Sequence, residues 1–226
     1  MTAPRRLALF DLDGTLLPID SDHAFGEFMI ALGWADAAEY RRRNDAFYEQ
    51  YKAERLDIDA YVDFCTVPWR DRSAAEQAAA QARFVDEVAR PALRESALAL
   101  VQRHRAAGDR LAVVTATNEF VTRPIAALFG IDTLIATELE RDAAGRVSGA
   151  IRGTPAFREG KVERVGAWLR AQGLGWADFA DQVFYSDSTN DLALLEHVSH
   201  PVATNPGPAL EAVAQQRRWP ILRLFA

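Results

Sequence analysis

Short apolar runs alternate along this chain with longer segments in which apolar residues recur at helical spacing. The clearest runs cover residues 7–10, 111–114 and 182–185, and polar residues follow each of them. Runs of this length, bounded by turn residues, are typical of buried strands in a parallel sheet. With the helical segments between them, they predict an α/β fold with a doubly wound, mostly parallel sheet.

Residues 18–90 interrupt this alternation, because they carry helical patterns and no strand-like β-branched run. Helices are expected there over residues 22–32, 36–51, 57–65 and 73–89, the last opened by a capping box of Ser73 and Glu76. Pro91 should open the helix that leads back to the core and ends near Gly108. We therefore predict a core of residues 1–17 and 91–226 with an inserted α-helical cap of residues 18–90.

The remaining core segments continue the alternation. We expect a helix up to residue 129, a strand at 133–137, a hairpin around 142–145, a helix at 162–172, a short helix after 191, a strand near 202, a helix from 208 and a final strand at 220–225.

Two carboxylates follow the first apolar run. Asp11 and Asp13 precede Gly14 and Thr15, and a strand that ends at Phe10 would release both acids into the crevice at its carboxyl end. One carboxylate can attack phosphorus while its other oxygen holds a divalent cation, which leaves the second acid free to handle protons. The same short pattern also occurs in solvent-exposed turns, so its meaning depends on the residues downstream.

Two candidates for binding phosphate lie further along the chain. Thr115 ends the second apolar run, where its hydroxyl and the adjacent N–H groups, including that of Ala116, can donate to a phosphoryl oxygen. The alternative is that Thr115 caps the next helix. Lys161 is expected in the first turn of a helix, where a cation is mildly unfavourable unless a phosphate with its carboxylates attracts it. The alternative is an ordinary surface lysine.

The third apolar run repeats the pattern of a strand followed by an acid. Asp187 ends this run, and Asn190 and Asp191 precede the next helical segment. One of the two aspartates can reach a metal while the other caps the helix or holds the lysine. Asp191 is also explicable as a plain negative charge at a helix N-terminus.

In order and spacing, these residues resemble the four motifs of the haloacid dehalogenase superfamily of phosphohydrolases. The resemblance is closest to the phosphoserine phosphatase-like branch, in which a helical cap follows the first motif. It implies that Asp11 is a nucleophile that becomes aspartyl-phosphate, and that Asp13 protonates the leaving oxygen and later activates water. It also implies Mg²⁺ bound by Asp11, Asp187 and the backbone carbonyl of Asp13. The remaining implied roles are phosphoryl binding by Thr115, Ala116 and Lys161, and support by Asn190 and Asp191.

Two positions depart from the family pattern. Ser186 stands where glycine usually precedes the first acid of the last motif, and Thr115-Ala116 replaces a serine-glycine pair. Neither change removes a catalytic group, so both are expected to tune the pocket.

Substrate choice is expected to lie mainly in the cap, and Asp20 and Asp22 follow the first motif closely enough to face the pocket. In phosphoserine phosphatases a glutamate near the position of Asp20 binds the substrate ammonium, which suggests an amine-bearing phosphate such as phosphoserine or histidinol phosphate. The alternative is that Asp20 or Asp22 caps the first helix. The basic cluster at residues 41–43 is interpreted as a solvated helix face.

Other activities remain open at this stage. A phosphate-binding regulator, a phospho-receiver switch and a phosphomutase all use parts of this residue set. Dehalogenation is disfavoured, because it has no need for the second acid, Asp13.

Composition disfavours nucleic acid and membranes as partners, which leaves the small phosphomonoester that the resemblance implies. The formal net charge of -6 over 226 residues gives no general affinity for nucleic acid or anionic membranes. Cys65 is the single cysteine, so no internal disulfide is expected. The basic segment of residues 1–6 precedes an apolar run too short for a signal peptide, and no run approaches the roughly 18 residues of a membrane span. A cytoplasmic enzyme is expected, and its oligomeric state is left open.

Overall fold

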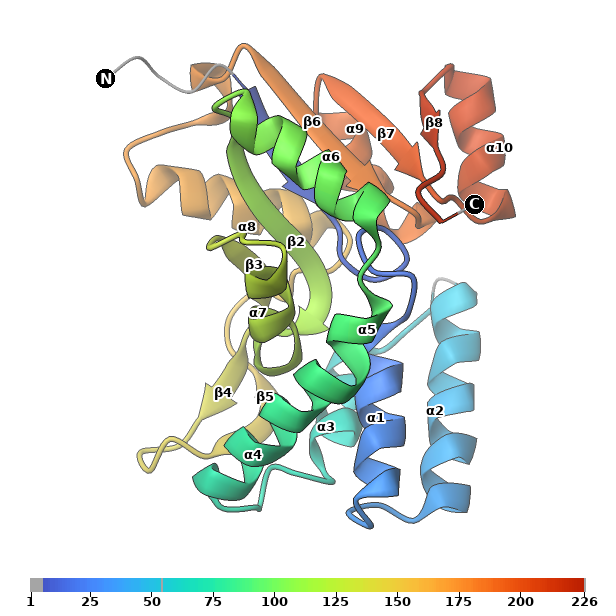
Figure 1. Ribbon diagram of the computed structural model, residues 1–226, viewed down its shortest axis with the longest axis vertical. Coiled ribbons are helices and arrows are strands. Elements are labelled where there is room, and N and C mark those ends of the chain that lie inside the picture. The colour runs from blue at the N-terminus through green and yellow to red at the C-terminus, as the bar shows by residue number, and fades with distance from the viewer. Residues whose placement is uncertain (1–5, 54, 226) are drawn as a thin grey trace.

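The computed structural model describes residues 6–53 and 55–225 and contains a six-stranded sheet at its centre (Figure 1). Residues 1–5, which hold most of the basic N-terminal segment, lie outside the described residues. The strands, in the spatial order β3-β2-β1-β6-β7-β8, are Leu134–Thr137, Arg110–Asn118, Arg6–Phe10, Asp181–Ser186, His200–Thr204 and Ile221–Leu222. Every pairing in this sheet is parallel, which confirms the predicted fold class.

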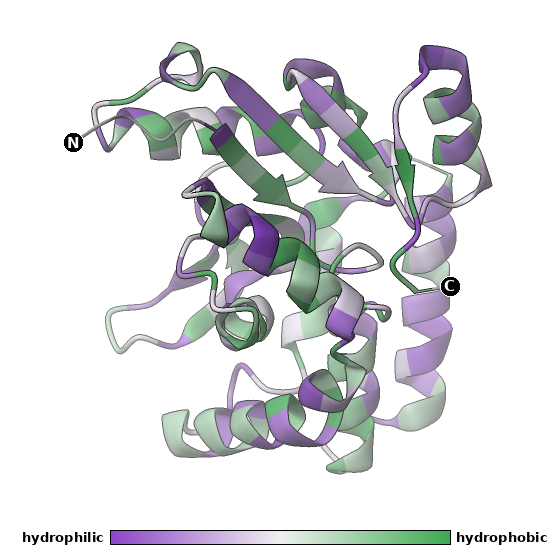
Figure 2. Cartoon of the chain, turned by 45° about the horizontal axis from the view of Figure 1, so that its top comes forward, coloured by the Kyte–Doolittle hydropathy of each residue, from purple (hydrophilic) through white to green (hydrophobic). Residues whose placement is uncertain are grey.

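The two faces of the sheet bury separate hydrophobic clusters, because successive side chains of a strand point to opposite sides. Leu7 and Leu9 of β1 pack in one cluster, and Ala8 and Phe10 in the other. Three helices cover the Leu7 face: α8 (Glu159–Arg170), α9 (Leu192–His197) and α10 (Pro208–Arg217). The Phe10 face is covered by α6 (Glu95–Ala106) and α7 (Glu119–Leu128). In Figure 2 the first strand is largely green, whereas the helices alternate between green and purple.

Four helices of the predicted cap lie together at one end of the molecule (Figure 1). They are α1 (Ser21–Ala31), α2 (Ala37–Lys52), α3 (Ile58–Thr66) and α4 (Ala74–Phe84), and they begin within two residues of the expected positions. A side-chain cap opens each of them, from Asp20, Asp36, Asp57 and Ser73 respectively. The capping box of Ser73 and Glu76 is present as predicted.

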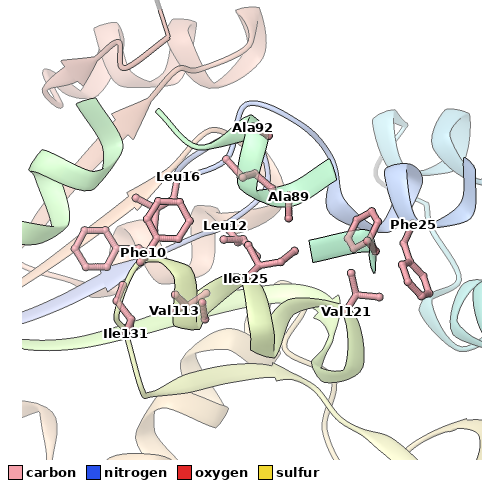
Figure 3. Close-up of a cluster of buried hydrophobic side chains, with 14 of the residues drawn as sticks. Phe10, Leu12, Leu16, Phe25, Ala89, Ala92, Val113, Val121, Ile125 and Ile131 are labelled. Atoms are coloured by element: carbon pink, nitrogen blue, oxygen red, sulfur yellow. The ribbon is translucent and has the colours of Figure 1, made fainter. Parts of the chain in front are cut away.

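The hydrophobic cluster on the Phe10 face continues into this group of helices. Figure 3 shows Phe10 and Val113 of the sheet and Ile125 of α7, with Ala89 and Phe25 further along the same cluster. The rings of Phe25 and Phe84 meet edge to face, with centroids 5.0 Å apart. Burial of apolar area therefore ties the helices to the sheet as well as to one another.

The start of the return helix was predicted wrongly at Pro91. A continuous helical run leads from α4 through a π-helical turn, η1 (Val85–Ala89), into α5 (Arg90–Ala92), and α6 begins only at Glu95. The π-helical turn η1 is wider than an α-helical turn, and it comes shortly before Pro91, which has no N–H to donate. A π-helical turn and a proline each disturb regular helix geometry. The break follows at Leu93, whose ψ is 143°, and Arg94 Nη1 donates to the carbonyl of Ala92 at 3.1 Å. Arg94 thus satisfies helix-end carbonyls that lack an internal partner.

An antiparallel hairpin, β4 (Leu139–Arg141) and β5 (Val147–Ile151), forms around the turn predicted at residues 142–145. The Asp142 carboxylate accepts from the N–H groups of Ala144 and Arg146, at 2.8 and 2.9 Å, and so fixes the turn. The hairpin packs against α3, although α3 lies about 80 residues earlier in the chain. Among the described residues, no helix is long and apolar enough to cross a membrane.

Candidate active site

The predicted site residues converge at the carboxyl ends of β1, β2 and β6, on either side of the central strand. Strand order reverses here, because β2 lies on one side of β1 and β6 on the other, and open α/β sheets bind ligands at such points. A cavity of about 450 Å³ opens at this edge. Its lining includes Asp11, Asp13, Asp20, Thr115, Ala116, Lys161, Asn190 and Asp191. Asp187 lies beside this cavity, where it is linked to Asp11 through Thr15.

Lys161 is buried between two carboxylates. Its side chain is 3% exposed, and Nζ donates to Asp11 Oδ1 at 2.9 Å and to Asp191 Oδ2 at 2.7 Å. Burial by itself lowers the pKa of Lys161, but the charges of Asp11 and Asp191 outweigh it and raise the pKa above its usual value. Lys161 therefore carries a fixed positive charge next to Asp11, and the surface-lysine alternative is wrong.

Asp11 and Asp187 face each other across a single hydroxyl. Thr15 Oγ1 lies 3.3 Å from Asp11 Oδ2 and 3.1 Å from Asp187 Oδ1. Gly14 has a φ of 72°, and a Cβ atom there would lie 2.4 Å from Asp187 Oδ2. Glycine is thus needed both for the turn and for the close approach of this carboxylate. Burial, and then the negative charge of Asp11, raise the pKa of Asp187 well above its usual value.

The geometry of these acids fits a divalent cation. Two buried carboxylates that face each other repel, and a hard cation with oxygen ligands relieves that repulsion. Within residues 6–53 and 55–225, no group of three or more histidine, cysteine or acidic side chains is arranged to hold a metal ion. The expected Mg²⁺ ligands are two carboxylates, from Asp11 and Asp187, and one backbone carbonyl, so they do not depend on such a group.

Asp13 is held by two donors. The N–H of Ser21 donates to Oδ1 at 2.8 Å, and the Thr117 hydroxyl donates to Oδ2 at 2.9 Å. Burial, and then the negative charge of Asp20, raise the pKa of Asp13 well above its usual value. A carboxyl group with a raised pKa keeps its proton to a higher pH, which suits a general acid. Sequence reasoning gave Thr117 no role, although a hydroxyl two residues after Thr115 is a signal for a second inward-facing polar side chain.

Asp191 holds the lysine and makes no side-chain cap to α9. Its Oδ2 also accepts from the Ser186 hydroxyl at 2.7 Å. Burial raises the pKa of Asp191 to about 6, although the charge of Lys161 opposes this. Asp191 thus gains a donor that the glycine usual at position 186 cannot supply. Asn190 lines the cavity, and its side-chain oxygen accepts from Arg158 Nε at 3.3 Å.

Thr115 is 1% exposed, and its hydroxyl accepts from the N–H of Thr117 at 3.2 Å. The cap of α7 is Asn118, whose side chain accepts from Val121 N, so the alternative role of Thr115 as that cap is wrong. Ala116 lies between the two threonines in the cavity wall.

The helix cap expected as the alternative role of Asp20 is present. Its carboxylate accepts from the N–H of His23 at 2.9 Å, while the residue is exposed and also lines the cavity. The basic cluster forms surface ion pairs, with Arg41 on Glu27 and Arg42 on Glu39. These contacts agree with a solvated helix face.

Asp22 lines the cavity, as its position shortly after the first motif suggested, and it is also buried. It is 6% exposed, and Asn118 Nδ2 lies 3.4 Å from its Oδ1. Burial, and then the negative charge of Asp20, raise the pKa of Asp22 to about 7, although the Tyr61 hydroxyl and the Cys65 thiol lower it by hydrogen bonding. A buried acid at this position was missed because burial cannot be read from a helix N-terminal pattern.

Replacement of Asp22 by asparagine should stabilise the fold at high pH. Because the folded-state pKa lies above the unfolded value, the folded protein holds this proton more tightly, and wild-type stability falls as the pH rises from about 4 to about 7. Asp22→Asn lacks this loss, so at pH 8 we expect a gain of about 4 kcal/mol in unfolding free energy, or roughly 8–16 °C in Tm. Thermal unfolding of the wild type and Asp22→Asn at pH 4 and pH 8 measures this gain. Asp20→Asn is the matched exposed control, and an equal gain at both pH values would contradict the prediction.

The chain is similar to known proteins both in sequence and in structure. A family model described as haloacid dehalogenase-like hydrolase matches residues 8–196. The chain is 43% identical over 218 residues to a histidinol-phosphatase of Neisseria meningitidis serogroup C (strain 8013), which covers 96% of this chain and 98% of the relative. A crystal structure of a protein with unknown function from Bordetella pertussis Tohama I superposes with a TM-score of 0.92 at 50% identity, over 98% of this chain and 100% of that one.

A phosphoserine phosphatase solved as a phospho-aspartyl intermediate analogue shares the fold. Its TM-score is 0.66 at 17% identity, over 97% of this chain and 93% of that one. The parallel sheet, its buried lysine and acids, and these matches define an α/β phosphatase. The chain belongs to the haloacid dehalogenase-like hydrolase family, as its sequence motifs indicated.

Proposed function

We propose that the chain hydrolyses a small amine-bearing phosphomonoester, with histidinol phosphate as the leading candidate. The observation that carries the proposal is the ion pair of Lys161 with Asp11, at 2.9 Å, in the wall of a cavity that also holds Asp20 and Asp22. A cation beside Asp11 would neutralise the phosphoryl group that reacts, and an acidic cavity would attract an amine. The histidinol-phosphatase relative, which this chain matches over nearly its full length, supports the same substrate.

In this proposal Asp11 is the nucleophile. One of its oxygens forms a bond to phosphorus while the bond from phosphorus to the ester oxygen breaks, which leaves an aspartyl-phosphate. Asp13, held by Ser21 N and Thr117, gives its proton to the departing alcohol oxygen. It then takes a proton from the water that attacks the phosphoryl group, so that inorganic phosphate is released and Asp11 is restored.

Lys161 and the backbone around Thr115 and Ala116 would bind the phosphoryl oxygens, because phosphoryl transfer depends mainly on positioning and charge neutralisation. Asp191 keeps Lys161 in place through its 2.7 Å hydrogen bond. Mg²⁺, when held by Asp11, Asp187 and the Asp13 carbonyl, would supply further positive charge at the phosphoryl group.

We also propose that residues 18–90 act as a cap over this site. The cavity wall combines the core acids with residues of α1, α2 and α3, including Tyr51 and Tyr61. The Tyr51 hydroxyl lies 3.0 Å from Ser188 Oγ, next to Asp187. This contact joins the end of α2 to the loop after β6, so cap and core meet at the reacting groups.

The test is phosphate release from histidinol phosphate, phosphoserine, sugar phosphates and nucleotides, with Mg²⁺ and with EDTA. We expect hydrolysis with Mg²⁺ and a loss of at least about a hundredfold with EDTA, because two facing carboxylates then lack their counter-charge. Added Mg²⁺ should restore the rate, and Ca²⁺, which tolerates looser geometry, serves as the control. Full activity in EDTA would contradict the metal assignment, and no hydrolysis of any substrate would contradict the proposed function.

A further inference from the structure

Asp22 presents a buried carboxylate to the cavity and takes no part in the proposed chemistry. It makes no ion pair with a lysine, arginine or histidine of residues 6–53 and 55–225. Its hydrogen-bond partners are neutral, namely Asn118 at 3.4 Å, Tyr61 and Cys65, and the charge that acts on it, that of Asp20, is also negative. A buried carboxylate without a cation is costly, so a protein gains by supplying one from a ligand.

The surroundings of Asp22 suit a cationic ligand. Phe47, Tyr48 and Tyr61 line the same cavity, and aromatic faces attract cations and stack on flat rings. Asp22 is also joined to the reacting end of the site. The N–H of the preceding residue, Ser21, holds the Asp13 carboxylate at 2.8 Å. Asp13 and Asp22 line the same cavity, so one ligand can reach both acids.

Apart from Asp11, Asp13 and Asp191, two other acids line the cavity, and both are exposed. Asp20 caps α1, and Asp45 lies within α2. An ion pair exposed to water contributes little binding free energy, because solvent screens the charges. The same pair contributes more where water is already excluded from the site.

We infer that Asp22 selects the substrate, by pairing its buried carboxylate with a protonated nitrogen on the alcohol part of the phosphomonoester. This inference rests on the proposed function and names the residue that gives that function its specificity. It moves the specificity role from Asp20, where the family resemblance placed it, to the residue two positions later.

The experiment compares histidinol phosphate with glycerol 3-phosphate, which lacks nitrogen, in wild type, Asp22→Asn and Asp20→Asn. In Asp22→Asn we expect the ratio of the two kcat/KM values to fall at least tenfold, mainly through a higher KM for histidinol phosphate. In Asp20→Asn the ratio should change less than threefold, and asparagine keeps the helix cap. A larger change in Asp20→Asn, or equal losses on both substrates in Asp22→Asn, would overturn the inference.

Inhibition by histidinol gives a second readout that is separate from turnover of its phosphate ester. Against hydrolysis of p-nitrophenyl phosphate, histidinol should inhibit the wild type competitively, and its inhibition constant should rise at least tenfold in Asp22→Asn. An unchanged constant would refute the role of Asp22 while the proposed function stands. If the wild type hydrolyses none of the three substrates, histidinol phosphate, glycerol 3-phosphate and p-nitrophenyl phosphate, the proposed function itself fails.

Discussion

Asp11→Asn should reduce phosphate release by at least about a thousandfold, which corresponds to about 4 kcal/mol of lost transition-state stabilisation. The amide keeps the shape of the carboxylate but is a far poorer nucleophile, and it no longer balances the charge of Lys161. Steady-state kinetics with histidinol phosphate and Mg²⁺ measure the loss. Asp11→Ala is needed beside it, because an asparagine that deamidates regenerates the aspartate.

A trapping measurement connects this loss to the nucleophile. Acid-quenched wild type, incubated with substrate labelled on phosphorus, should retain label on Asp11, and both variants should retain none. Asp86→Asn, in an exposed acid of the π-helical turn that pairs with Arg90, is the control for handling and folding. Residual activity above about one per cent in Asp11→Ala, or label retained by that variant, would remove Asp11 from the mechanism.

Lys161→Met should cost both activity and stability. Removal of one partner from a buried ion pair leaves uncompensated charge, which typically costs about 3–5 kcal/mol, and here two carboxylates, of Asp11 and Asp191, lose their shared cation. We expect at least a hundredfold lower kcat/KM, because the phosphoryl oxygens lose the same charge. Urea unfolding and kinetics on one preparation measure the two effects.

The chain supplies the matched control, since Lys52 is exposed and pairs with Glu49 on the surface of α2. Lys52→Met should leave activity and Tm nearly unchanged, because exposed ion pairs add little. The loss in Lys161→Met should also be smaller at pH 5 than at pH 8. The pKa of Asp191 is already raised to about 6, so acid removes the charge that has lost its partner. Equal effects of the two lysine variants would contradict the site.

Several features of the fold were predictable because local physics decides them. The apolar runs at residues 7–10 and 182–185 became the paired central strands β1 and β6. The cap helices begin where acidic or serine side chains accept their first N–H groups. The predicted helix start at Pro91 was wrong, because a π-helical turn continues the preceding helix through the proline. The local apolar pattern does not distinguish a π-helical turn from an α-helical one.

Contacts between distant segments could not be predicted in the same way. The packing of the β4–β5 hairpin on α3 joins residues that the sequence assigns to different parts of the molecule. The continuous cluster from Phe10 to Phe25 likewise depends on how the cap helices meet the sheet. Apolar side chains at helical spacing predict that a face is buried, but they do not say what buries it.

The sequence by itself determined the α/β class, the residues available for chemistry and their position at the ends of strands, because strand ends and motif spacing are local properties. Only the tertiary structure decided their environments: Lys161 lies between Asp11 and Asp191, Ser186 donates to Asp191, and Asp22 is buried in the cavity wall. The burial of a side chain and its ion-pair or hydrogen-bond partners depend on segments far apart in the chain. Together they set the pKa, and therefore the charge, of each group.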